Sequence, residues 1–255
     1  MTLDDLRKNW DGLGRADPFW AILAYPNRLG GGWQGHEEDF FASGEDAVNE
    51  IMAALRHHSA FPSRTDRALD FGCGAGRLTQ ALAQHFDHVD GVDVASSMVD
   101  LARQHNRRGD NVDYHLNVAP DLGLFPADTF DFLLSIIVLQ HIPNALKVRY
   151  LTEFVRVLRP GGVAAFTVPS HGDWSIEGAV RRLPNSWQNV YRRRRYGYED
   201  VMEFHPLRRR KVEQLLRRAG ADVVHVEQEY MAGPRYTSYL YVIRKPAALV
   251  AAQGQ

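Results

Sequence analysis

The residues best suited to chemistry lie in a glycine-rich stretch, residues 68–79, with the sequence ALDFGCGAGRLT. Its glycines occupy alternate positions, Gly72, Gly74 and Gly76. A strand that passes through glycines into a helix brings bare backbone and a helix N-terminus close to a ligand. Asp70 precedes the glycines, where its carboxylate can accept hydrogen bonds from that ligand. The dinucleotide fingerprint G-x-G-x-x-G would place its third glycine at position 77, where this chain has arginine.

Alternating apolar strands and helices are predicted around this stretch. The strands are expected near residues 66–71, 88–92, 112–116, 130–136 and 163–168. The helices are expected near residues 75–85, 96–107 and 144–158. This alternation predicts right-handed crossovers and a parallel sheet that is covered on both faces. In such an open sheet the ligand site lies beyond the carboxyl ends of the strands.

Two further apolar runs follow a helix that is predicted at residues 208–219. Residues 222–228 and 237–243 should pair as an antiparallel edge, joined by a turn at Gly233 and Pro234. The expected fold class is therefore α/β: a Rossmann-like, seven-stranded, mostly parallel sheet with an antiparallel C-terminal strand.

Five ordered motifs across residues 66–170 resemble those of the class I S-adenosylmethionine-dependent methyltransferases, in particular small-molecule enzymes of the type 11 kind. The glycine stretch resembles the first signature of this family. Asp93, 19 positions after Gly74, is similar to the acidic residue that binds both ribose hydroxyls at the end of the second strand. The remaining motifs are the strand that ends at Asn117, the buried strand that leads to Gln140 and His141, and LRPGG at residues 158–162.

The resemblance implies S-adenosylmethionine as the cofactor. In the family the glycine loop lets the methionine part lie against the backbone, and an Asp or Asn at the place of Asn117 holds the adenine amino group. The hydroxyls of Ser96 and Ser97 are suited to helix capping, and Met98 can pack on the adenine face. The expected cofactor-binding residues are Asp70, Gly72, Cys73, Gly74, Gly76, Asp93, Val94, Met98, Asn117, Val118 and Ile136. Cys73 is also expected to be a small buried residue, and no metal ligand is expected.

Methyl transfer from a sulfonium is an in-line displacement, which needs an aligned nucleophile and a site without water. An oxygen acceptor must also lose its proton, to a base or through a low pKa of its own. Three histidines are candidate bases: His141 after the fourth strand, His205 in a later insertion, and His36 in the N-terminal segment. In the family the histidine of such a Gln-His-Ile-Pro pattern is often structural. His57 and His58 are expected to be solvated at a helix end.

Several acceptor classes are disfavoured. The fourth strand is followed by SIIV at residues 135–138 instead of Asn-Pro-Pro-Tyr, which argues against an exocyclic base amine or a glutamine acceptor. The apolar residues 136–139 offer no cluster of metal ligands for a catechol-type site. The single cysteine cannot support paired-cysteine mechanisms. We therefore expect the O or N nucleophile of a small-molecule metabolite, with acidic metabolites among the candidates.

The chain outside the cofactor fold is expected to supply the acceptor pocket. Asp17-Pro18 predicts a helix start, and Ser43-Gly-Glu-Asp46 predicts a capping-box start for another helix. Gly30–Gly32, beside aromatic residues, suggests a loop that can open and close. Residues 170–207 are expected to form an insertion of low regularity that reaches the same edge of the sheet. The expected divisions are a helical cap at 1–60, a methyltransferase domain at 61–246 and a tail at 247–255.

Positive charge concentrates in residues 181–218, which hold eleven arginines and Lys211 against four acidic residues. Within this stretch Arg192–Arg195 lie between two tyrosines. Arginines interleaved with aromatic residues can bind RNA or an anionic substrate, whereas a solvated helix face is the structural alternative. Arg217 and Arg218 fit a helix C-terminus, where positive charge is favoured.

The composition fits a cytoplasmic enzyme with one main domain. The 255 residues are 45% hydrophobic, enough for a full α/β core, and their formal net charge is −1. One cysteine excludes an intramolecular disulfide framework, and neither an apolar run of membrane-spanning length nor a signal-peptide pattern is present. The expected partner is a small-molecule acceptor, without nucleic acid or membrane, and the oligomeric state stays open.

Other classes of protein stay open beside this interpretation. A nicotinamide-dependent oxidoreductase is disfavoured by arginine at position 77 and by the Asn117 motif. An RNA-modifying methyltransferase that uses Arg192–Arg195, or a non-catalytic S-adenosylmethionine-binding module, would share the cofactor motifs. A melting temperature raised by NAD would indicate the oxidoreductase, and one raised by S-adenosylmethionine would exclude it. A steep fall of RNA affinity with salt would indicate RNA binding.

Overall fold

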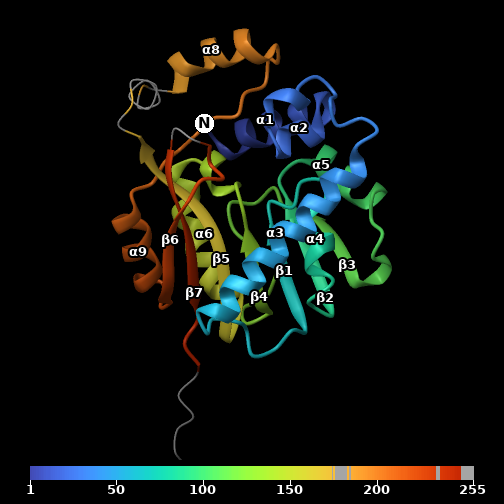
Figure 1. The fold of residues 1–255 in the computed structure, drawn as a ribbon. Coiled ribbons are helices and arrows are strands. Elements are labelled where there is room, and N and C mark those ends of the chain that lie inside the picture. The colour runs from blue at the N-terminus through green and yellow to red at the C-terminus, as the bar shows by residue number, and fades with distance from the viewer. Residues whose placement is uncertain (174, 176–182, 184, 234–235, 248–255) are drawn as a thin grey trace, which may run out of the picture.

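A single mixed β-sheet forms the centre of the protein (Figure 1). The computed structural model describes residues 1–173, 175, 183, 185–233 and 236–247. The strands are β1 (Arg67–Phe71), β2 (His88–Asp93), β3 (Val112–Leu116), β4 (Phe130–Ser135), β5 (Leu158–Gly172), β6 (Asp222–Glu229) and β7 (Tyr236–Arg244). Their order is β3-β2-β1-β4-β5-β7-β6. The pairs among β1 to β5 are parallel, and β7 runs antiparallel to both β5 and β6, which confirms the predicted fold class.

Helices cover both faces of the sheet, as the alternating pattern predicts. One face carries α3 (Glu37–His57), α4 (Arg77–Leu82) and α5 (Ser96–Gln104), and the other carries α6 (Asn144–Val157) and α9 (Arg209–Arg218) (Figure 1). The central strand β4 is buried along its whole length. Its alternate side chains enter the two cores, with Phe132 packed on the α3 side and Leu133 on the α6 side.

The N-terminal segment forms a cap at the carboxyl edge of the sheet. It contains α1 (Leu3–Ala16), α2 (Pro18–Ile22) and a short 3-10 helix, η1 (Pro26–Arg28). Thr2 and Asp5 begin α1 with a reciprocal capping box, in which the Asp5 N–H donates to Thr2 Oγ1 at 3.2 Å and the Thr2 N–H donates to Asp5 at 2.7 Å. A further helix, α8 (Asn185–Tyr196), lies beyond the cap (Figure 1).

Two sequence predictions about these outer segments are wrong. Helix α3 begins at Glu37 and not at Ser43, because an acidic first turn supports the earlier start and the Ser43 hydroxyl donates to the Phe40 carbonyl within the helix at 2.6 Å. The insertion is more regular than expected, since β5 continues to Gly172 and α8 follows.

Element boundaries inside the sheet domain differ in two further places. Helix α4 is shorter than the predicted 75–85: it begins after Gly76, whose φ is 83°, and it ends at Leu82. Strand β5 starts at Leu158, which pairs with Phe130, so LRPGG belongs to the strand. Pro234 of the predicted turn, parts of the insertion and most of the tail lie outside the described residues. Among the described helices, none combines the length and the apolar character that a bilayer-spanning helix requires.

Candidate functional site

The turn between β1 and α4 forms the floor of the candidate site. Its glycines all adopt positive φ values, 79° at Gly72, 53° at Gly74 and 83° at Gly76. A Cβ atom on Gly74 would lie 2.7 Å from Cδ1 of Ile22 in α2. A Cβ atom on Gly72 would collide with the side chain of Val138, which follows β4. Both the backbone conformation and the close packing therefore require glycine here.

Asp93 ends β2 and holds the glycine loop from beside it. Its carboxylate accepts hydrogen bonds from the backbone N–H of Gly74 at 3.0 Å and of Ala95 at 2.9 Å. Burial raises the pKa of Asp93, although these N–H groups oppose the shift. A carboxylate can accept about four hydrogen bonds, so this one retains capacity for the hydroxyl groups of a ligand.

Asp70 is a buried carboxylate at the end of β1, with only 2% of its surface exposed. The Thr79 hydroxyl donates a hydrogen bond to the Asp70 carboxylate at 2.7 Å. Burial raises the pKa of Asp70 to about 7, and the Thr79 hydrogen bond only partly opposes this. A cationic group placed beside Asp70 would therefore be strongly favoured.

Cys73 lies inside the loop and is buried, as the sequence predicts. Burial raises the pKa of its thiol well above the usual value, with the nearby carboxylates adding to the effect. A thiol in that state is a poor nucleophile. Cys73 therefore acts as a small packing residue of the loop.

The expectation that Ser96 and Ser97 cap α5 with their own hydroxyls is wrong. The N-cap residue is Ala95, which makes no side-chain capping bond. Instead Asp11 of α1 accepts hydrogen bonds from the Ser97 N–H at 3.1 Å and from both serine hydroxyls at 3.2 Å. Met98 is fully buried in a cluster that includes Leu13 of α1. The cap thus supplies the acidic group and the apolar cover at the start of α5.

Asn117 follows β3, but its amide spans its own loop. The Nδ2 atom donates to the Asp121 carbonyl at 2.7 Å, and Oδ1 accepts from the Ala119 N–H at 3.1 Å. The other predicted apolar contacts differ in exposure: Ile136 is buried, Val94 is partly buried and Val118 is exposed. Their contact with a cofactor stays a prediction.

Ile137, directly after β4, is strained in a way that the sequence did not indicate. It has a φ of 56°, which is rare for a β-branched residue. Its N–H donates to the Thr167 hydroxyl at 2.9 Å, which holds this conformation. Backbone strain of this kind concentrates at functional sites.

His141 is buried in an aromatic setting beyond the end of β4. Its ring lies 5.0 Å from Trp10 of α1 and 4.9 Å from Phe204, measured between centroids. Nδ1 lies 2.9 Å from the Glu203 carbonyl, so it donates there, and Nε2 then accepts from the Gln140 amide at 3.1 Å. Burial lowers the pKa of His141 to about 4. Both ring nitrogens are therefore occupied by the protein.

The backbone N–H of His205 donates to the backbone carbonyl of Gln140 at 2.7 Å, which places His205 beside His141. Its Nε2 atom is 3.2 Å from the Glu203 carboxylate. Burial lowers the pKa of His205, although Glu203 opposes the shift. The lowered pKa favours the neutral ring, and Nε2 lies close to a carboxylate without a hydrogen-bond partner among the described residues.

Lys147 is a functional candidate that the sequence reading missed. It is fully buried in the first turn of α6, where its amine donates to Asn144 Oδ1 at 3.2 Å and to the His205 carbonyl. Burial lowers its pKa to about 7. Its helical spacing from Tyr150, Leu151 and Phe154 was the available signal, since that face of α6 is otherwise apolar.

His36 is placed apart from the other two candidate bases. It is the exposed N-cap residue of α3, and its Nδ1 lies 3.1 Å from Asp39 Oδ2. Of the three predicted histidines, the structure brings together only His141 and His205.

The cap and the insertion meet above the sheet, as expected, through Asp17. This residue is the N-cap of α2, before Pro18, but its carboxylate does not cap the helix. It accepts hydrogen bonds from the N–H groups of Gly30 at 2.8 Å and Gly31 at 3.0 Å, and from the Tyr198 hydroxyl at 3.0 Å. One buried carboxylate thus joins α2, the glycine-rich loop and the insertion.

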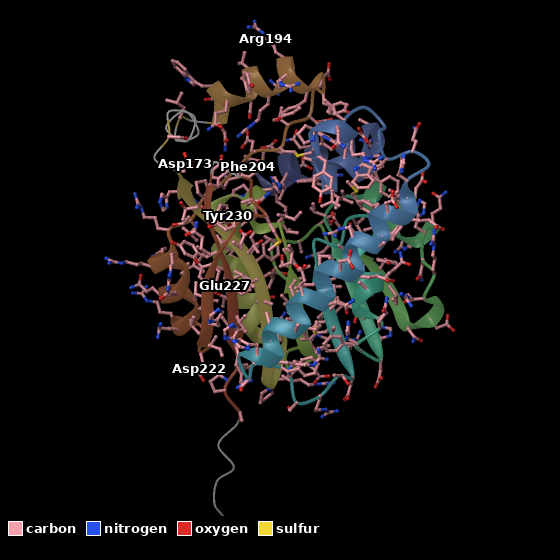
Figure 2. All side chains as sticks on the ribbon, viewed as in Figure 1. Asp173, Arg194, Phe204, Asp222, Glu227 and Tyr230 are labelled. Carbon is pink, nitrogen blue, oxygen red and sulfur yellow. The ribbon has the colours of Figure 1, made fainter. Side chains whose placement is uncertain are left out.

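The arginine cluster on α8 divides into a buried and an exposed part. Arg192 is buried, and its guanidinium donates to the side chains of Asn185, Gln188 and Asn189. Arg194 lies on the outer side of the helix, whereas Phe204 lies in the body of the molecule (Figure 2). The solvated-face interpretation therefore fits Arg194, and it does not fit Arg192.

Comparison with known sequences gives matches over the central part of the chain. Residues 68–162 match a family model described as a methyltransferase domain. A ubiquinone biosynthesis O-methyltransferase from Hahella chejuensis is 32% identical over 127 residues, 49% of this chain and 52% of that protein. A protein of the same name from Xylella fastidiosa is 33% identical over 129 residues, 46% of this chain and 50% of its own length. The chain thus spans about half the length of the curated relatives it matches.

Solved structures with the same fold extend over more of the chain. Magnesium protoporphyrin IX methyltransferase from Synechocystis PCC 6803, solved with bound SAH, has a TM-score of 0.62 at 16% identity and covers 94% of this chain and 97% of its own. A protein from Galdieria sulphuraria, whose name gives it provisionally as a sarcosine dimethylglycine methyltransferase, has a TM-score of 0.58 at 17% identity, with 78% of this chain and 86% of that chain covered. At these identities the likeness establishes the fold.

Proposed function

We propose that the chain is a class I S-adenosylmethionine-dependent methyltransferase, which transfers the methyl group of that cofactor to an oxygen or nitrogen nucleophile of a small molecule. The observation that carries this proposal is the pair of carboxylates, buried Asp70 and half-buried Asp93, on either side of a loop whose glycine positions leave no room for a Cβ atom. The names of the sequence relatives favour an oxygen acceptor.

The residues of the loop fit this cofactor on their own chemistry. Asp93 retains hydrogen-bonding capacity for two ribose hydroxyls, and burial raises the pKa of Asp70 despite the opposing charge of Arg77, so a further cation beside Asp70 would be favoured. The ammonium of the methionine part would supply that cation. When bound, S-adenosylmethionine supplies an activated sulfonium methyl, so the protein needs only to align the acceptor and exclude water.

The cap is proposed to exclude water from the reacting groups. Ile22 lies against Gly74, and Trp10 lies against His141, so α1 and α2 touch both halves of the site. The Asp17 carboxylate holds the Gly30–Gly31 loop to the insertion. Opening of this loop would release both segments together, which makes it a suitable gate for cofactor and acceptor.

His205 is proposed as the general base for an oxygen acceptor. The Glu203 carboxylate lies 3.2 Å from Nε2, where its charge would stabilise the imidazolium that forms once Nδ1 takes the proton. His141 is proposed as a positioning residue, because its two nitrogens hold the Glu203 backbone and the Gln140 amide. Lys147 fixes the His205 carbonyl from the other side.

The proposal is tested by cofactor binding and by turnover. S-adenosylmethionine, and not NAD, should raise the melting temperature, and S-adenosylhomocysteine should form when phenols, carboxylates or amines are supplied as acceptors. Asp93→Ala should weaken cofactor binding by roughly 30-fold, since hydrogen bonds to a charged group contribute about 1.5–3 kcal/mol. The matched control is Asp100→Ala, which removes an exposed carboxylate from α5. Stabilisation by NAD alone, or equal affinities of Asp93→Ala and the wild type, would contradict the assignment.

A further inference from the structure

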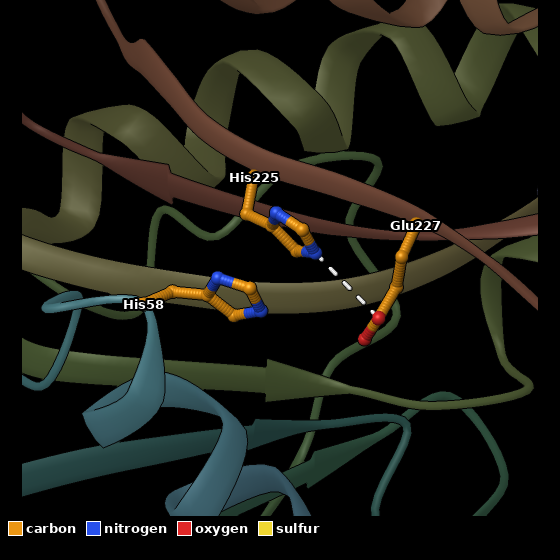
Figure 3. A group of neighbouring side chains, drawn as sticks. All are labelled: His58, His225 and Glu227. Carbon is orange, nitrogen blue, oxygen red and sulfur yellow. Dashed lines mark ion pairs between the residues drawn. The ribbon is translucent and has the colours of Figure 1, made fainter.

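A second group of side chains with ligand chemistry lies far from the glycine loop, where the end of α3 meets the outer strand of the sheet (Figure 3). It consists of His58, His225 and Glu227, and one ligand atom from each lies within 4.8 Å of the other two. The two imidazole rings stack with 3.6 Å between centroids and 20° between planes. Figure 3 shows that both rings turn a nitrogen toward the Glu227 carboxylate.

The fold places these three residues together by two separate devices. His58 is the C-cap of α3, and the turn after it is closed by the Ala60 N–H, which donates to the Leu55 carbonyl at 2.8 Å. Arg244 of β7 secures the same turn by donating to the Ser59 carbonyl at 3.0 Å. His58 is half-buried and its ring stacks on His225, so the expectation that it is solvated is wrong.

A β-bulge brings the other two residues to the same face. Val223 pairs with Ile243, and His225 pairs with Val242, so one extra residue interrupts the register of β6. In a regular strand His225 would share the face of Val223, which packs toward α6 and α9. The bulge turns His225 and Glu227 to the α3 face instead, opposite His58.

The contact between the His225 ring and the Glu227 carboxylate is too long for a hydrogen bond. His225 Nε2 lies 3.5 Å from Glu227 Oε2, and this buried nitrogen has no hydrogen-bond partner among the described residues. Two imidazoles and one carboxylate form a donor set that suits Zn²⁺ and related cations. A tetrahedral ion with bonds of about 2.0–2.1 Å needs ligand atoms roughly 3.3 Å apart, so small side-chain rotations would complete the site.

We propose that His58, His225 and Glu227 bind a divalent cation of the Zn²⁺ class, which links the end of α3 to the edge strand β6. Glu227 is partly exposed, so a fourth position is open to water. Another group, His88, Asp90 and Asp113, also has ligand spacing, but Arg67 already donates to both oxygens of Asp90 at 2.6 and 3.0 Å. The cation site therefore belongs to the α3–β6 junction.

The test is a Zn²⁺ titration of the full chain after chelator treatment and dialysis. One Zn²⁺ per chain should bind by calorimetry, the melting temperature should rise by several degrees at saturation, and Co²⁺ should give the visible absorption of a nitrogen-ligated tetrahedral ion. His225→Ala and Glu227→Gln should each weaken binding by on the order of tenfold or more. The matched control is His57→Ala, which removes the exposed neighbouring imidazole and should bind as the wild type does.

Three outcomes would overturn the proposal. The first is a wild-type chain that takes up no Zn²⁺ at micromolar concentrations. The second is wild-type binding by the variants at His225 and Glu227. The third is a loss of binding in His88→Ala, which would move the site to the other group. Glu227→Gln changes a partly exposed side chain and should fold, so it decides the matter even where His225→Ala does not.

Discussion

The carboxyl edge of the sheet has two halves whose buried charges are perturbed in opposite directions. The donor side consists of residues 70–76 and Asp93, and burial raises the pKa of its carboxylates. The acceptor side consists of His141, Lys147 and His205, and burial lowers the pKa of its bases. Desolvation disfavours the charged form in both cases. Burial thus disfavours the ionised carboxylates in one half and the protonated bases in the other.

This difference separates what each half would contribute to the proposed methyl transfer. The donor side gains from a ligand with positive charge and hydroxyl groups, and its partners in the free protein are backbone N–H groups and Thr79. The acceptor side already satisfies His141 through the Glu203 carbonyl and Gln140. We infer that the donor side is completed by its ligand, whereas the acceptor side is preorganised by the protein.

The largest expected effect comes from the point where the cap touches the donor side. Gly74→Ala should lower the free energy of unfolding by about 3 kcal/mol, because the residue must keep a left-handed conformation and its Cβ would press on Ile22. Urea unfolding measures this loss. The added variant Ile22→Ala should recover the collision part of the loss and leave the conformational part.

Gly30→Ala is the matched control for this comparison. Gly30 also has a positive φ, 75°, but a Cβ atom there would meet nothing within 4 Å. Its cost should be limited to about 1–2 kcal/mol for the left-handed conformation. Equal losses for Gly74→Ala and Gly30→Ala would show that α2 does not press on the glycine loop.

The next effect concerns the acceptor side and acid. The pKa of His141 falls from 6.5 to about 4 on folding, so between these pH values the unfolded chain binds a proton that the folded protein does not. The folded protein therefore has its full stability above pH 6.5 and loses stability as the pH falls toward 4. His141→Phe should therefore reduce the difference in unfolding free energy between neutral pH and about pH 4.5 by roughly 2 kcal/mol. Urea unfolding at the two pH values measures it, with His36→Gln as an exposed control. An unchanged pH dependence in His141→Phe would mean that this ring is not buried as described.

The sheet domain was largely predictable from sequence because its elements are local and periodic. The apolar runs gave all seven strands, and the glycine spacing placed Asp70, Gly74 and Asp93 at one edge. Strand β5 was placed too short, since Arg159 and Pro160 are unusual in a strand, and only the pairing of Leu158 with Phe130 explains them. Local sequence patterns therefore predicted the existence of each strand better than its first and last residues.

The cap and the acceptor side were less predictable because their order depends on distant contacts. Asp11 binds Ser97, and Tyr198 binds Asp17, across more than eighty positions of chain in each case. No spacing rule links such pairs. Lys147 is different, since its place on the apolar face of α6 was visible in the sequence and was overlooked. Ile137 gave no signal, because its strain arises from packing and from Thr167.

The smallest effect tests the donor side directly and has the opposite sign to that of His141. With a pKa raised to about 7, Asp70 favours folding less as the pH rises from its unfolded value toward 7, so Asp70→Asn should steepen the gain in stability with pH that His141 produces. In the proposed complex, the ionised form of Asp70 would attract the methionine ammonium. Affinity for S-adenosylmethionine should therefore fall about tenfold between about pH 8 and about pH 6, since ionised Asp70 decreases by that factor. Calorimetry in buffers of different ionisation enthalpy should detect proton release on binding near neutral pH. Asp70→Asn should bind more weakly with a flat pH response, and a wild-type affinity independent of pH would place the ammonium elsewhere.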